Sequence, residues 1–382
     1  VDNPTDMAFI PGSVNDFIVI EQSGRVKYFK SNTCSVVNTV DLRDVNTGGI
    51  DVTNGGEQGL LNIEFHPDFA SNAYVFFYHT RVATASERIN AVSRMSVGFD
   101  QEGLLVLSDP QKIIDFRKLG VAGNHNGGGL LFAPDKTLLA SVGDGGSGSH
   151  DNAQDDTNLM GAVIRILPSL NIGQGGYSIP SGNKYSSSNP QCSNSIPSVM
   201  PCPEILAKGL RNPYRMVLHN DIVYLGDVGS GYEEINSFSY SNSTINFAWP
   251  IRDGLAMNSE FTDPILTYQR SDATASRFRE EDPACNNCAT GYASVMIGDV
   301  YRGTRYDGLL NSKLLHAEYM DAFMRAMTVD DAGLATDSGM HLIHHDGISA
   351  MIQGPDDFIY IVTQKGAWGT GDADMVYRLI KH

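Results

Sequence analysis

Short apolar runs, each about the length of one strand, recur along the whole chain. Turn-forming Gly, Asn, Asp and Pro residues bound them, and patterns of helical period are scarce. Apolar or aromatic runs of this length between turn residues are typical of buried β-strands. The pattern therefore predicts strands at residues 17–20, 74–78, 138–142, 222–225 and 358–362.

Each of these runs is the second half of a repeated unit. A first apolar strand precedes it, and a turn such as Pro134-Asp135 joins the two. Six copies follow one another at irregular spacings of roughly 50–80 residues, and the fifth copy, at 295–329, is the weakest. Repeated strand pairs that bury their faces against one another are typical of a β-propeller. We predict an all-β fold: a six-bladed β-propeller of four-stranded antiparallel blades that forms a single domain over residues 1–382.

Two other folds fit the pattern less well. A flat β-sandwich does not naturally contain six similar hairpins over this length, and a parallel α/β fold needs crossover helices between its strands. The uneven spacing implies long insertions at 144–158, 167–204 and 252–292, which are rich in Gly, Ser, Asn and Asp and are predicted to be loops. Long loops in a compact domain are usually functional.

The composition fits a folded repeat protein and argues against some partners. The chain has 382 residues, of which 41% are apolar, and this proportion argues against global disorder. The net charge is −17 and no block of basic residues is present, so nucleic acid is not an expected partner. No apolar run reaches the roughly 20 residues that a membrane-spanning helix needs.

Five cysteines bear on the cellular compartment. Cys192 and Cys202 flank a Ser- and Pro-rich stretch, and Cys285 and Cys288 lie in a polar loop without the second CxxC or the nearby His of a metal or haem site. We expect two local disulfides and an unpaired Cys34, and hence a periplasmic or secreted protein. Because the sequence begins with Val1 and not with Met, we also expect it to be a trimmed mature form or to have an artificially chosen first residue.

Six short motifs occur in the order found in one enzyme family. They are Gly56-Glu57-Gln58-Gly59-Leu60-Leu61, His125-Asn126-Gly127-Gly128-Gly129, Asn158-Leu159-Met160-Gly161, Gly209-Leu210-Arg211-Asn212-Pro213, Asp227-Val228-Gly229 with Glu233-Glu234-Ile235-Asn236, and Asn246-Phe247-Ala248-Trp249-Pro250. Through these motifs the chain resembles the soluble glucose and aldose sugar dehydrogenases that use pyrroloquinoline quinone (PQQ). The resemblance implies oxidation of a small-molecule aldose, with hydride transfer from the sugar C1 to the quinone, a Ca²⁺ ion beside the cofactor and an external electron acceptor.

His125 is the residue that the resemblance identifies as the general base. It precedes three glycines just before an expected inner strand, and such small neighbours leave room for a planar ring. An imidazole suits proton abstraction because its ordinary pKa lies near neutral pH. The structural alternative is a loop His that hydrogen-bonds to the backbone.

The resemblance also implies residues that bind the cofactor. Arg211 and Asn212 match the pair that contacts the quinone, and a guanidinium offers a planar fork of donors to a carboxylate or quinone oxygen. Arg211 could instead pair with a carboxylate of a blade. Further candidates for the same cleft are Glu57, Asp144, Gln154 and Arg302, although Asp144, which lies among glycines, could simply form a turn.

Gly229 and Ser230 match the residues whose backbone carbonyls hold calcium in the family. Ca²⁺ prefers oxygen ligands, backbone carbonyls included, and such an ion would make a bound quinone more electrophilic. Val228 stands where some relatives place an oxygen-bearing side chain, so the site lacks one possible ligand.

The chain departs from the glucose-type pattern at one hairpin. Met320 and Asp321 stand where those relatives place basic residues that meet the three carboxylates of PQQ, and an acid there would repel them. Arg325 or Lys365 would have to substitute. This departure is the main argument in the sequence against cofactor binding.

Three functions remain open at this point. The first is a PQQ-dependent aldose sugar dehydrogenase, as a monomer or homodimer. The second is a non-catalytic extracellular binding propeller that has lost cofactor binding; the hedgehog-interacting proteins share this propeller, and the fold alone does not decide between the two functions. The third, a calcium-dependent hydrolase or lactonase, has no nucleophile motif in the sequence to support it.

Overall fold

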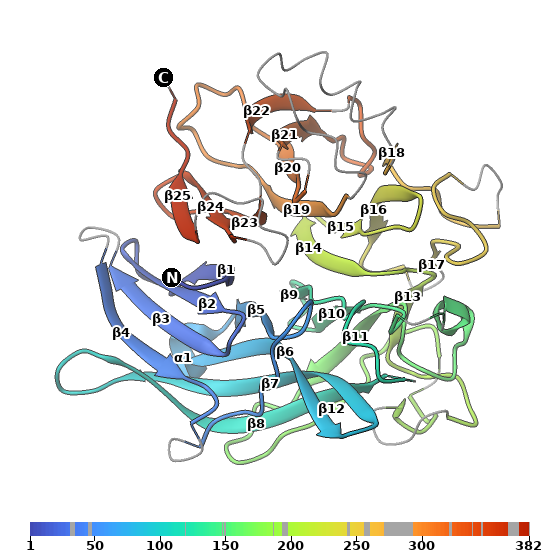
Figure 1. Cartoon of the computed structure of the whole chain (residues 1–382), viewed down its shortest axis with the longest axis horizontal. Helices are drawn as coiled ribbons and strands as arrows, with labels where there is room; N and C mark the ends of the chain where they lie inside the picture. The colour runs from blue at the N-terminus through green and yellow to red at the C-terminus, as the bar shows by residue number, and fades with distance from the viewer. Residues whose placement is uncertain are drawn as a thin grey trace.

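The computed structural model contains six small sheets arranged in a ring (Figure 1). It describes residues 1–30, 35–44, 48–118, 120–146, 148, 150–185, 187–192, 198–242, 245–255, 260–270, 293–320, 323–337, 339–344, 347–365 and 374–381. Six sheets around one axis are the architecture of a six-bladed β-propeller, so the predicted fold is confirmed. Helix is sparse in the described part, where α1 (Phe69–Asn72) and the 3₁₀ helix η2 (His150–Gln154) are both short.

The sheets follow one another along the chain and are numbered as blades from the N-terminus. Blade 1 consists of β1 (Pro4–Phe9), β2 (Asp16–Glu21), β3 (Arg25–Lys30) and β4 (Ser35–Asp41). Blade 2 consists of β5 (Leu60–Phe65), β6 (Tyr74–Thr84), β7 (Glu87–Phe99) and β8 (Leu105–Arg117). Blade 3 consists of β9 (Leu130–Phe132), β10 (Leu138–Val142), β11 (Ala162–Pro168), β12 (Tyr177–Ser178), β13 (Ile205–Lys208) and β17 (Ile245–Asn246).

The C-terminal half of the chain forms the other three blades. Blade 4 consists of β14 (Pro213–His219), β15 (Ile222–Asp227), β16 (Tyr232–Ser239) and β18 (Leu266–Gln269). Blade 5 consists of β19 (Val295–Val300), β20 (Lys313–Glu318), β21 (Phe323–Thr328) and β22 (Met340–His344). Blade 6 consists of β23 (Ile348–Gln353), β24 (Ile359–Thr363) and β25 (Met375–Arg378).

Four blades have the predicted four antiparallel strands, and blades 3 and 6 differ. In blade 3, β17 pairs in parallel with β13, and β12 pairs with β11. Blade 6 has three strands within the described residues. Two of the insertions predicted to be loops contain strands, β12 and β18, which are only two and four residues long. Strands this short cannot carry the apolar pattern that marks an inner strand.

The innermost strands line the centre of the ring. β1 packs beside both β5 and β23, so the first and last blades close the ring. The Ser349 hydroxyl on β23 also donates to the Pro4 carbonyl at 3.0 Å. Residues that precede β5, β9 and β14 contact one another at one end of the ring. Residues that follow β19 and β23 contact one another at the opposite end. The ring therefore has one mouth at the starts of its innermost strands and another at their ends.

A buried arginine connects four blades at the centre of the ring. Arg215 on β14 donates to the Ser349 carbonyl (3.2 Å), the Leu61 carbonyl (3.0 Å) and the Thr5 carbonyl (2.6 Å). These three partners belong to β23, β5 and β1. The guanidinium also lies 4.0 Å from the carboxylate of Asp6. Arg215 is only 5% exposed, so one side chain bridges the centre of the ring.

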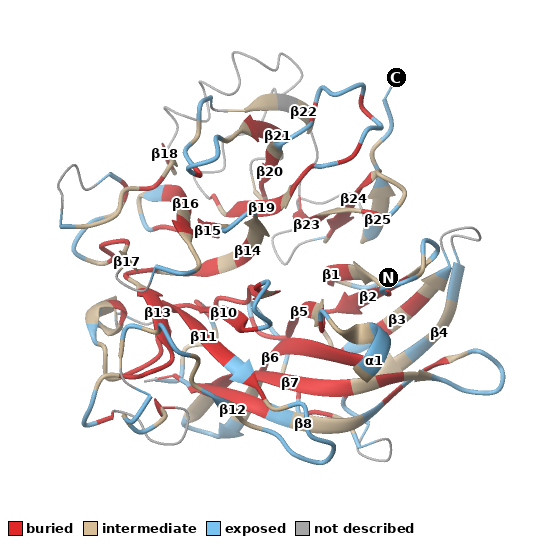
Figure 2. Cartoon of the chain, turned by 180° about the vertical axis from the view of Figure 1, so that it is seen from behind, coloured by how far each residue is buried: buried red, intermediate tan, exposed pale blue. Residues whose placement is uncertain are grey.

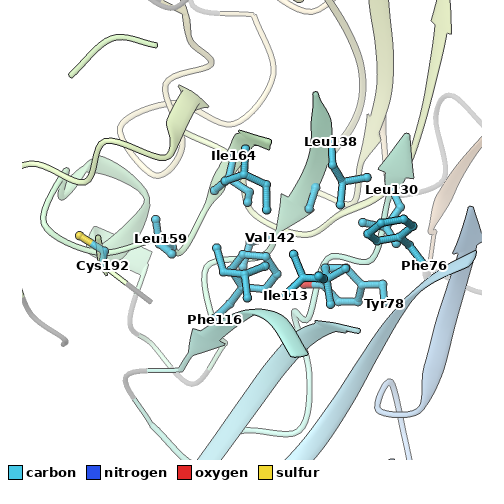
Figure 3. Close-up of a cluster of buried hydrophobic side chains, with 14 of the residues drawn as sticks. Phe76, Tyr78, Ile113, Phe116, Leu130, Leu138, Val142, Leu159, Ile164 and Cys192 are labelled. Carbon is cyan, nitrogen blue, oxygen red and sulfur yellow. The ribbon is translucent and has the colours of Figure 1, made fainter. Parts of the chain in front are cut away.

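Apolar side chains fill the spaces between neighbouring blades. Figure 2 shows buried residues along the strands and exposed residues mainly in the connecting loops. A large cluster joins blades 2 and 3 (Figure 3), where the rings of Tyr78 and Phe116 stack at 5.8 Å and pack with Leu130 and Leu138. Burial of each such side chain contributes about 1.5–3 kcal/mol, so these interfaces fix the positions of the loops at the two mouths.

The predicted disulfide between Cys192 and Cys202 is present, and both residues are buried. Cys34, Cys285 and Cys288 lie outside the described residues, so the other cysteine predictions stay predictions. Among the described residues, no helix is both long and apolar enough to cross a membrane.

Carboxyl groups near the centre of the ring lead us to predict that the effect of one substitution on stability depends on pH. Burial raises the pKa of Glu64 to about 8 and that of Asp299 to about 6, and the nearby Asp6 adds to both increases. In the unfolded chain a Glu ionises near pH 4.3, so native Glu64 binds more protons between about pH 4 and 8 and its contribution to stability is lost as the pH rises. We expect Glu64→Gln to stabilise the protein relative to wild type at pH 8, by roughly 1–3 kcal/mol more than at pH 5.

Chemical unfolding of both proteins at the two pH values measures this difference. Because wild type and variant are compared at the same pH, the titration of groups that do not interact with Glu64 cancels. An equal effect of Glu64→Gln at pH 5 and pH 8 would contradict the prediction.

Candidate active site

Three loops meet at the mouth formed by the starts of β5, β9 and β14. Glu57 precedes β5, His125 precedes β9 and Asn212 precedes β14. The Glu57 carboxylate accepts hydrogen bonds from the His125 amide (2.7 Å) and from the Asn212 side chain (3.2 Å). The Asn212 side-chain oxygen in turn accepts the Gly127 amide at 3.0 Å. Three of the residues predicted for the site are thus in direct contact.

The loop that carries His125 has an unusual backbone conformation. His125 has a φ of +51°, in the left-handed region that residues other than Gly adopt rarely. Gly127 follows with a φ of +68°, and a Cβ added there would overlap the Ser141 carbonyl. The buried Lys118 ammonium fixes the loop by donating to the Asn124 carbonyl at 2.6 Å. Backbone strain of this kind clusters at functional sites, where the surroundings hold it in place.

Asp144 is the centre of the hydrogen-bond network at this mouth. Its Oδ1 lies 2.6 Å from Nδ1 of His125, and its Oδ2 lies 2.7 Å from Nδ1 of His150 and 3.0 Å from Nε1 of Trp249. The Gly146 amide donates to Oδ1 at 2.8 Å, so Asp144 does form a turn, as the structural alternative holds. Asp144 is fully buried. One carboxylate therefore orients two imidazoles and an indole.

These contacts keep Asp144 ionised. Burial alone would raise the pKa of Asp144, but the hydrogen bonds from His125, His150 and the Gly146 amide lower it well below the ordinary range. An ionised acceptor at Nδ1 favours the His125 tautomer that carries its proton there, so Nε2 is the basic nitrogen of the ring. The Asp of a Ser-His-Asp triad holds its His in the same way.

A second buried carboxylate holds Arg211 and Asn212. Their backbone amides donate to Asp227 at 2.8 and 2.6 Å, and burial raises the pKa of Asp227 to about 7 despite these bonds. Arg211 Nη1 donates to the Val228 carbonyl at 2.7 Å, and the guanidinium lies 5.5 Å from the centre of the Trp249 ring. Arg211 Nε is buried and has no acceptor among the described residues. Within the described part of the chain it is therefore an unsatisfied donor.

Gln154 supports the position of Trp249. Its side-chain amide donates to the Trp249 carbonyl at 2.7 Å and to the Asn246 side chain at 3.0 Å. The structure thus connects Gln154 to the Asp144 network through Trp249.

Arg302 and Arg325 are not brought to His125. Arg302 follows β19 and so lies at the opposite mouth of the ring, where its amide donates to the Gln353 side chain at 2.7 Å. Arg325 lies on β21, is buried within blade 5 and donates to the Gly339 carbonyl. Arg302 is kept from the mouth that holds His125 by the direction of β19, and Arg325 is kept from it by burial within blade 5.

The hairpin that departs from the glucose-type pattern lies at the same mouth as His125. Met320 follows β20 and is half-buried, whereas Asp321 lies outside the described residues. Lys365 follows β24 at this mouth and is exposed, and its backbone amide donates to Asp374 at 2.7 Å. Of Arg325 and Lys365, the two cations predicted to replace the missing basic residues, Lys365 lies at the mouth that holds His125.

Comparison with known proteins assigns the family. Residues 1–370 match the family described as glucose/sorbosone dehydrogenase. The chain belongs to this family. It is 23% identical over 379 residues to aldose sugar dehydrogenase YliI of Escherichia coli, a match that covers 96% of this chain and 88% of that protein. It is also 28% identical over 174 residues to the human hedgehog-interacting protein, a match that covers 43% of this chain and 23% of that protein.

Solved structures of related enzymes have the same fold. The PQQ-bound aldose sugar dehydrogenase of Streptomyces coelicolor superposes with a TM-score of 0.70 at 20% identity, covering 99% of this chain and 94% of that one. The apo form of the soluble aldose sugar dehydrogenase of E. coli gives a TM-score of 0.71 at 20% identity, covering 95% and 93%. At these identities the likeness shows the fold, and the chemistry of this family member must be argued from its own residues.

Four residues join the site although the sequence did not predict them. His150 lies in a Gly- and Ser-rich insertion, and its ring packs edge-on against Trp249 at 5.2 Å. Trp249 and Asp227 belong to motifs that carried the family resemblance, which implied no role for them. Gln58 stands beside Glu57, and its Nε2 is buried without an acceptor among the described residues. The one sequence signal for His150 is its position six residues after Asp144.

Two groups of residues at this mouth bear on metal binding. The ligating atoms of His125, Asp144 and His150 lie within 4.8 Å of one another, but both imidazoles are already at hydrogen-bond distance from the carboxylate. At the predicted calcium position, the Gly229 carbonyl accepts a hydrogen bond from Arg270 Nη1 at 2.6 Å, and Ser230 is exposed. As arranged, the Gly229 carbonyl already has a cationic partner, so this carbonyl does not fit a calcium ligand.

Proposed function

We propose that this member of the family oxidises an aldose sugar, with PQQ as the hydride acceptor and His125 as the general base. The observation that carries the proposal is the 2.6 Å contact between His125 Nδ1 and Asp144 Oδ1. It fixes the ring in the tautomer whose Nε2 can accept a proton. When bound, the quinone supplies a two-electron acceptor for the hydride that leaves the sugar C1 as the hydroxyl proton passes to His125.

The donors at this mouth suit an anionic, oxygen-rich cofactor. Arg211 Nε and Gln58 Nε2 are buried and have no acceptor among the described residues. Buried donors without a partner cost free energy, which the oxygens of a bound quinone would relieve. The Arg211 guanidinium also provides charge-assisted hydrogen bonds for the carboxylates of PQQ.

Handling of the proton is the part of the reaction that the chain itself performs. When His125 takes the proton of the sugar hydroxyl, its imidazole becomes positively charged, and the ionised Asp144 at Nδ1 stabilises that charge. His150 and Trp249 donate to the other carboxylate oxygen and so keep Asp144 from turning away. A base held this rigidly needs little reorganisation when the proton moves.

Addition of PQQ to the purified protein tests the proposal. We expect the absorption spectrum of the quinone to change on binding, and a redox dye to be reduced when an aldose is added. The panel of sugars should include hexoses, pentoses and disaccharides, since the sequence does not identify the substrate. An unchanged quinone spectrum together with no dye reduction by any aldose would exclude the proposed reaction.

That negative result would favour the second function, a binding propeller without catalysis. The partial match to the hedgehog-interacting protein and the uncharged Met320 at the hairpin after β20 point in that direction. The network around Asp144 points to the enzyme, because a binding surface does not need a buried, ionised carboxylate that orients an imidazole. We therefore favour the enzyme.

The disulfide between Cys192 and Cys202 supports a location outside the cytosol. We propose that the protein is periplasmic or secreted and passes its electrons to an acceptor in that compartment.

A further inference from the structure

Two arginines donate to consecutive carbonyls of the loop between β15 and β16. Arg211 Nη1 donates to the Val228 carbonyl at 2.7 Å, and Arg270 Nη1 donates to the Gly229 carbonyl at 2.6 Å. Arg211 precedes β14 and Arg270 follows β18, so the two ends of blade 4 supply the two guanidinium groups. This loop follows β15 at the mouth that holds His125.

Arg270 is anchored in this position by several contacts. Its backbone amide donates to the Gly231 carbonyl at 2.9 Å, and its Nη1 lies 3.0 Å from Oε1 of Glu233. The other oxygen of Glu233 accepts the Val295 amide at 2.8 Å, and the Glu233 side chain is fully buried. The Arg270 side chain is 20% exposed, so its guanidinium is largely enclosed without being sealed from the mouth.

The loop itself is held in one conformation. A Cβ added to Gly229 would overlap the Tyr232 carbonyl, so the chain turns back tightly on itself. Asp253 accepts the Gly231 amide at 2.5 Å and holds the other side of the turn. The Gly229 carbonyl is therefore not free to turn away from Arg270.

The oxygens around Arg270 are of the kind that calcium prefers, but its guanidinium already donates to the Gly229 carbonyl and lies 3.0 Å from Glu233 Oε1. Ca²⁺ requires six to eight oxygen ligands, and here the Gly229 carbonyl and the Glu233 carboxylate both face Arg270. A guanidinium at hydrogen-bond distance from these oxygens repels a divalent cation. Val228 adds no side-chain oxygen in compensation.

From these contacts we propose that the Arg270 guanidinium takes the place of calcium at the Gly229 loop, so that the chain binds its anionic cofactor without Ca²⁺. Arg270 also provides a fixed positive charge at the mouth where the hairpin with Met320 lacks one. The cofactor part of this inference rests on the proposed function, whereas the statement that Arg270 excludes calcium does not.

Thermal unfolding without any quinone tests the calcium part. Wild type, Arg270→Ala and Arg270→Lys are melted in EDTA and in millimolar CaCl₂. We expect the wild-type and Arg270→Lys melting temperatures to differ by less than about 1 °C between the two buffers, and that of Arg270→Ala to rise by several degrees in calcium, because an ion that binds only the native state stabilises it. Arg81→Ala is the matched control: Arg81 is 23% exposed and pairs with Asp115 at 2.9 Å, and its loss should create no calcium response.

Two results would overturn the calcium part. One is a wild-type melting temperature that rises in calcium as much as that of Arg270→Ala. The other is an Arg270→Ala protein that folds in EDTA and does not respond to calcium. If Arg270→Ala folds only when calcium is present, that result supports the proposal. If it folds in neither buffer, the responses of wild type and Arg270→Lys decide.

Titration with PQQ, followed by the absorption of the quinone, tests the cofactor part. We expect wild type to bind PQQ equally well, within about twofold, in EDTA and in calcium. Arg270→Ala should bind about tenfold more weakly in EDTA, because a charge-assisted hydrogen bond is lost, and should recover in calcium. Loss of wild-type binding in EDTA would overturn the inference. Absence of wild-type binding in both buffers would instead contradict the proposed function, and the melting experiment would still test the role of Arg270.

Discussion

Replacing His125 by alanine is expected to lower kcat by about 10²–10⁴-fold, the usual contribution of a positioned general base. The fold should survive, because Asp144 keeps its bonds to His150, Trp249 and the Gly146 amide when His125 is lost. We therefore expect the melting temperature to fall by only a few degrees. Dye-reduction kinetics of the quinone-loaded protein and thermal unfolding of the same preparation measure the two effects.

Two further variants separate the loss of the base from the loss of packing. His125→Asn keeps a donor for Asp144 but cannot accept a proton at neutral pH, so it should be as inactive as the alanine variant. His66→Ala is the matched control: His66 is also a buried histidine, but it follows β5 at the opposite mouth, and kcat should not change. If His125→Ala loses much of its stability while the folded fraction keeps a normal kcat, His125 is a structural residue.

The role of Asp144 explains what a sequence can and cannot show of such a site. The Gly-rich stretch around Asp144 is typical of a turn, and the turn bond from the Gly146 amide is present. The decisive partner, Trp249, lies 105 residues further along the chain. The parallel pairing of β17 with β13 at the edge of blade 3, just before Trp249, brings the indole to the carboxylate. Local patterns predict the turn, but they contain no signal for so distant a donor.

The inner strands could be predicted because each has its own apolar signal. β2, β10 and β24 are buried along most of their length, so their sequences are continuous apolar runs. The outer strands β12 and β18 are too short for such a signal and lie inside polar insertions. Arg270 directly follows β18 in the same polar insertion, so the sequence pattern did not indicate its role.

The order of the strands also determines which arginines reach the site. The family resemblance implied that Arg211 and Arg302 both bind the cofactor. Arg211 precedes the innermost strand β14, whereas Arg302 follows the innermost strand β19. In a propeller whose innermost strands all start at one mouth, this difference sends the two side chains to opposite ends of the ring. The repeat pattern contained this information, and the assignment of Arg302 to the site rested on the resemblance alone.

Replacing Arg215 by alanine is expected to destabilise the protein by about 3–5 kcal/mol, the usual cost of removing one partner from a buried charge pair. Its guanidinium donates to the carbonyls of Thr5, Leu61 and Ser349, and these acceptors would be left without their donor at the centre of the ring. Asp6 would lose its nearby cation. Equilibrium unfolding by urea, followed by tryptophan fluorescence and by circular dichroism, measures the change in free energy.

Two comparisons identify the source of this loss. Arg43→Ala removes an exposed arginine that pairs with Asp41 on blade 1, and its cost should stay within about 0.5 kcal/mol. Asp6→Asn combined with Arg215→Ala should cost less than the sum of the two single changes, because neither buried charge of this pair is left without its partner once both are made. If the effects are simply additive, Asp6 does not depend on Arg215. If Arg215→Ala costs less than about 1 kcal/mol, the packing between neighbouring blades closes the ring without a central bridge.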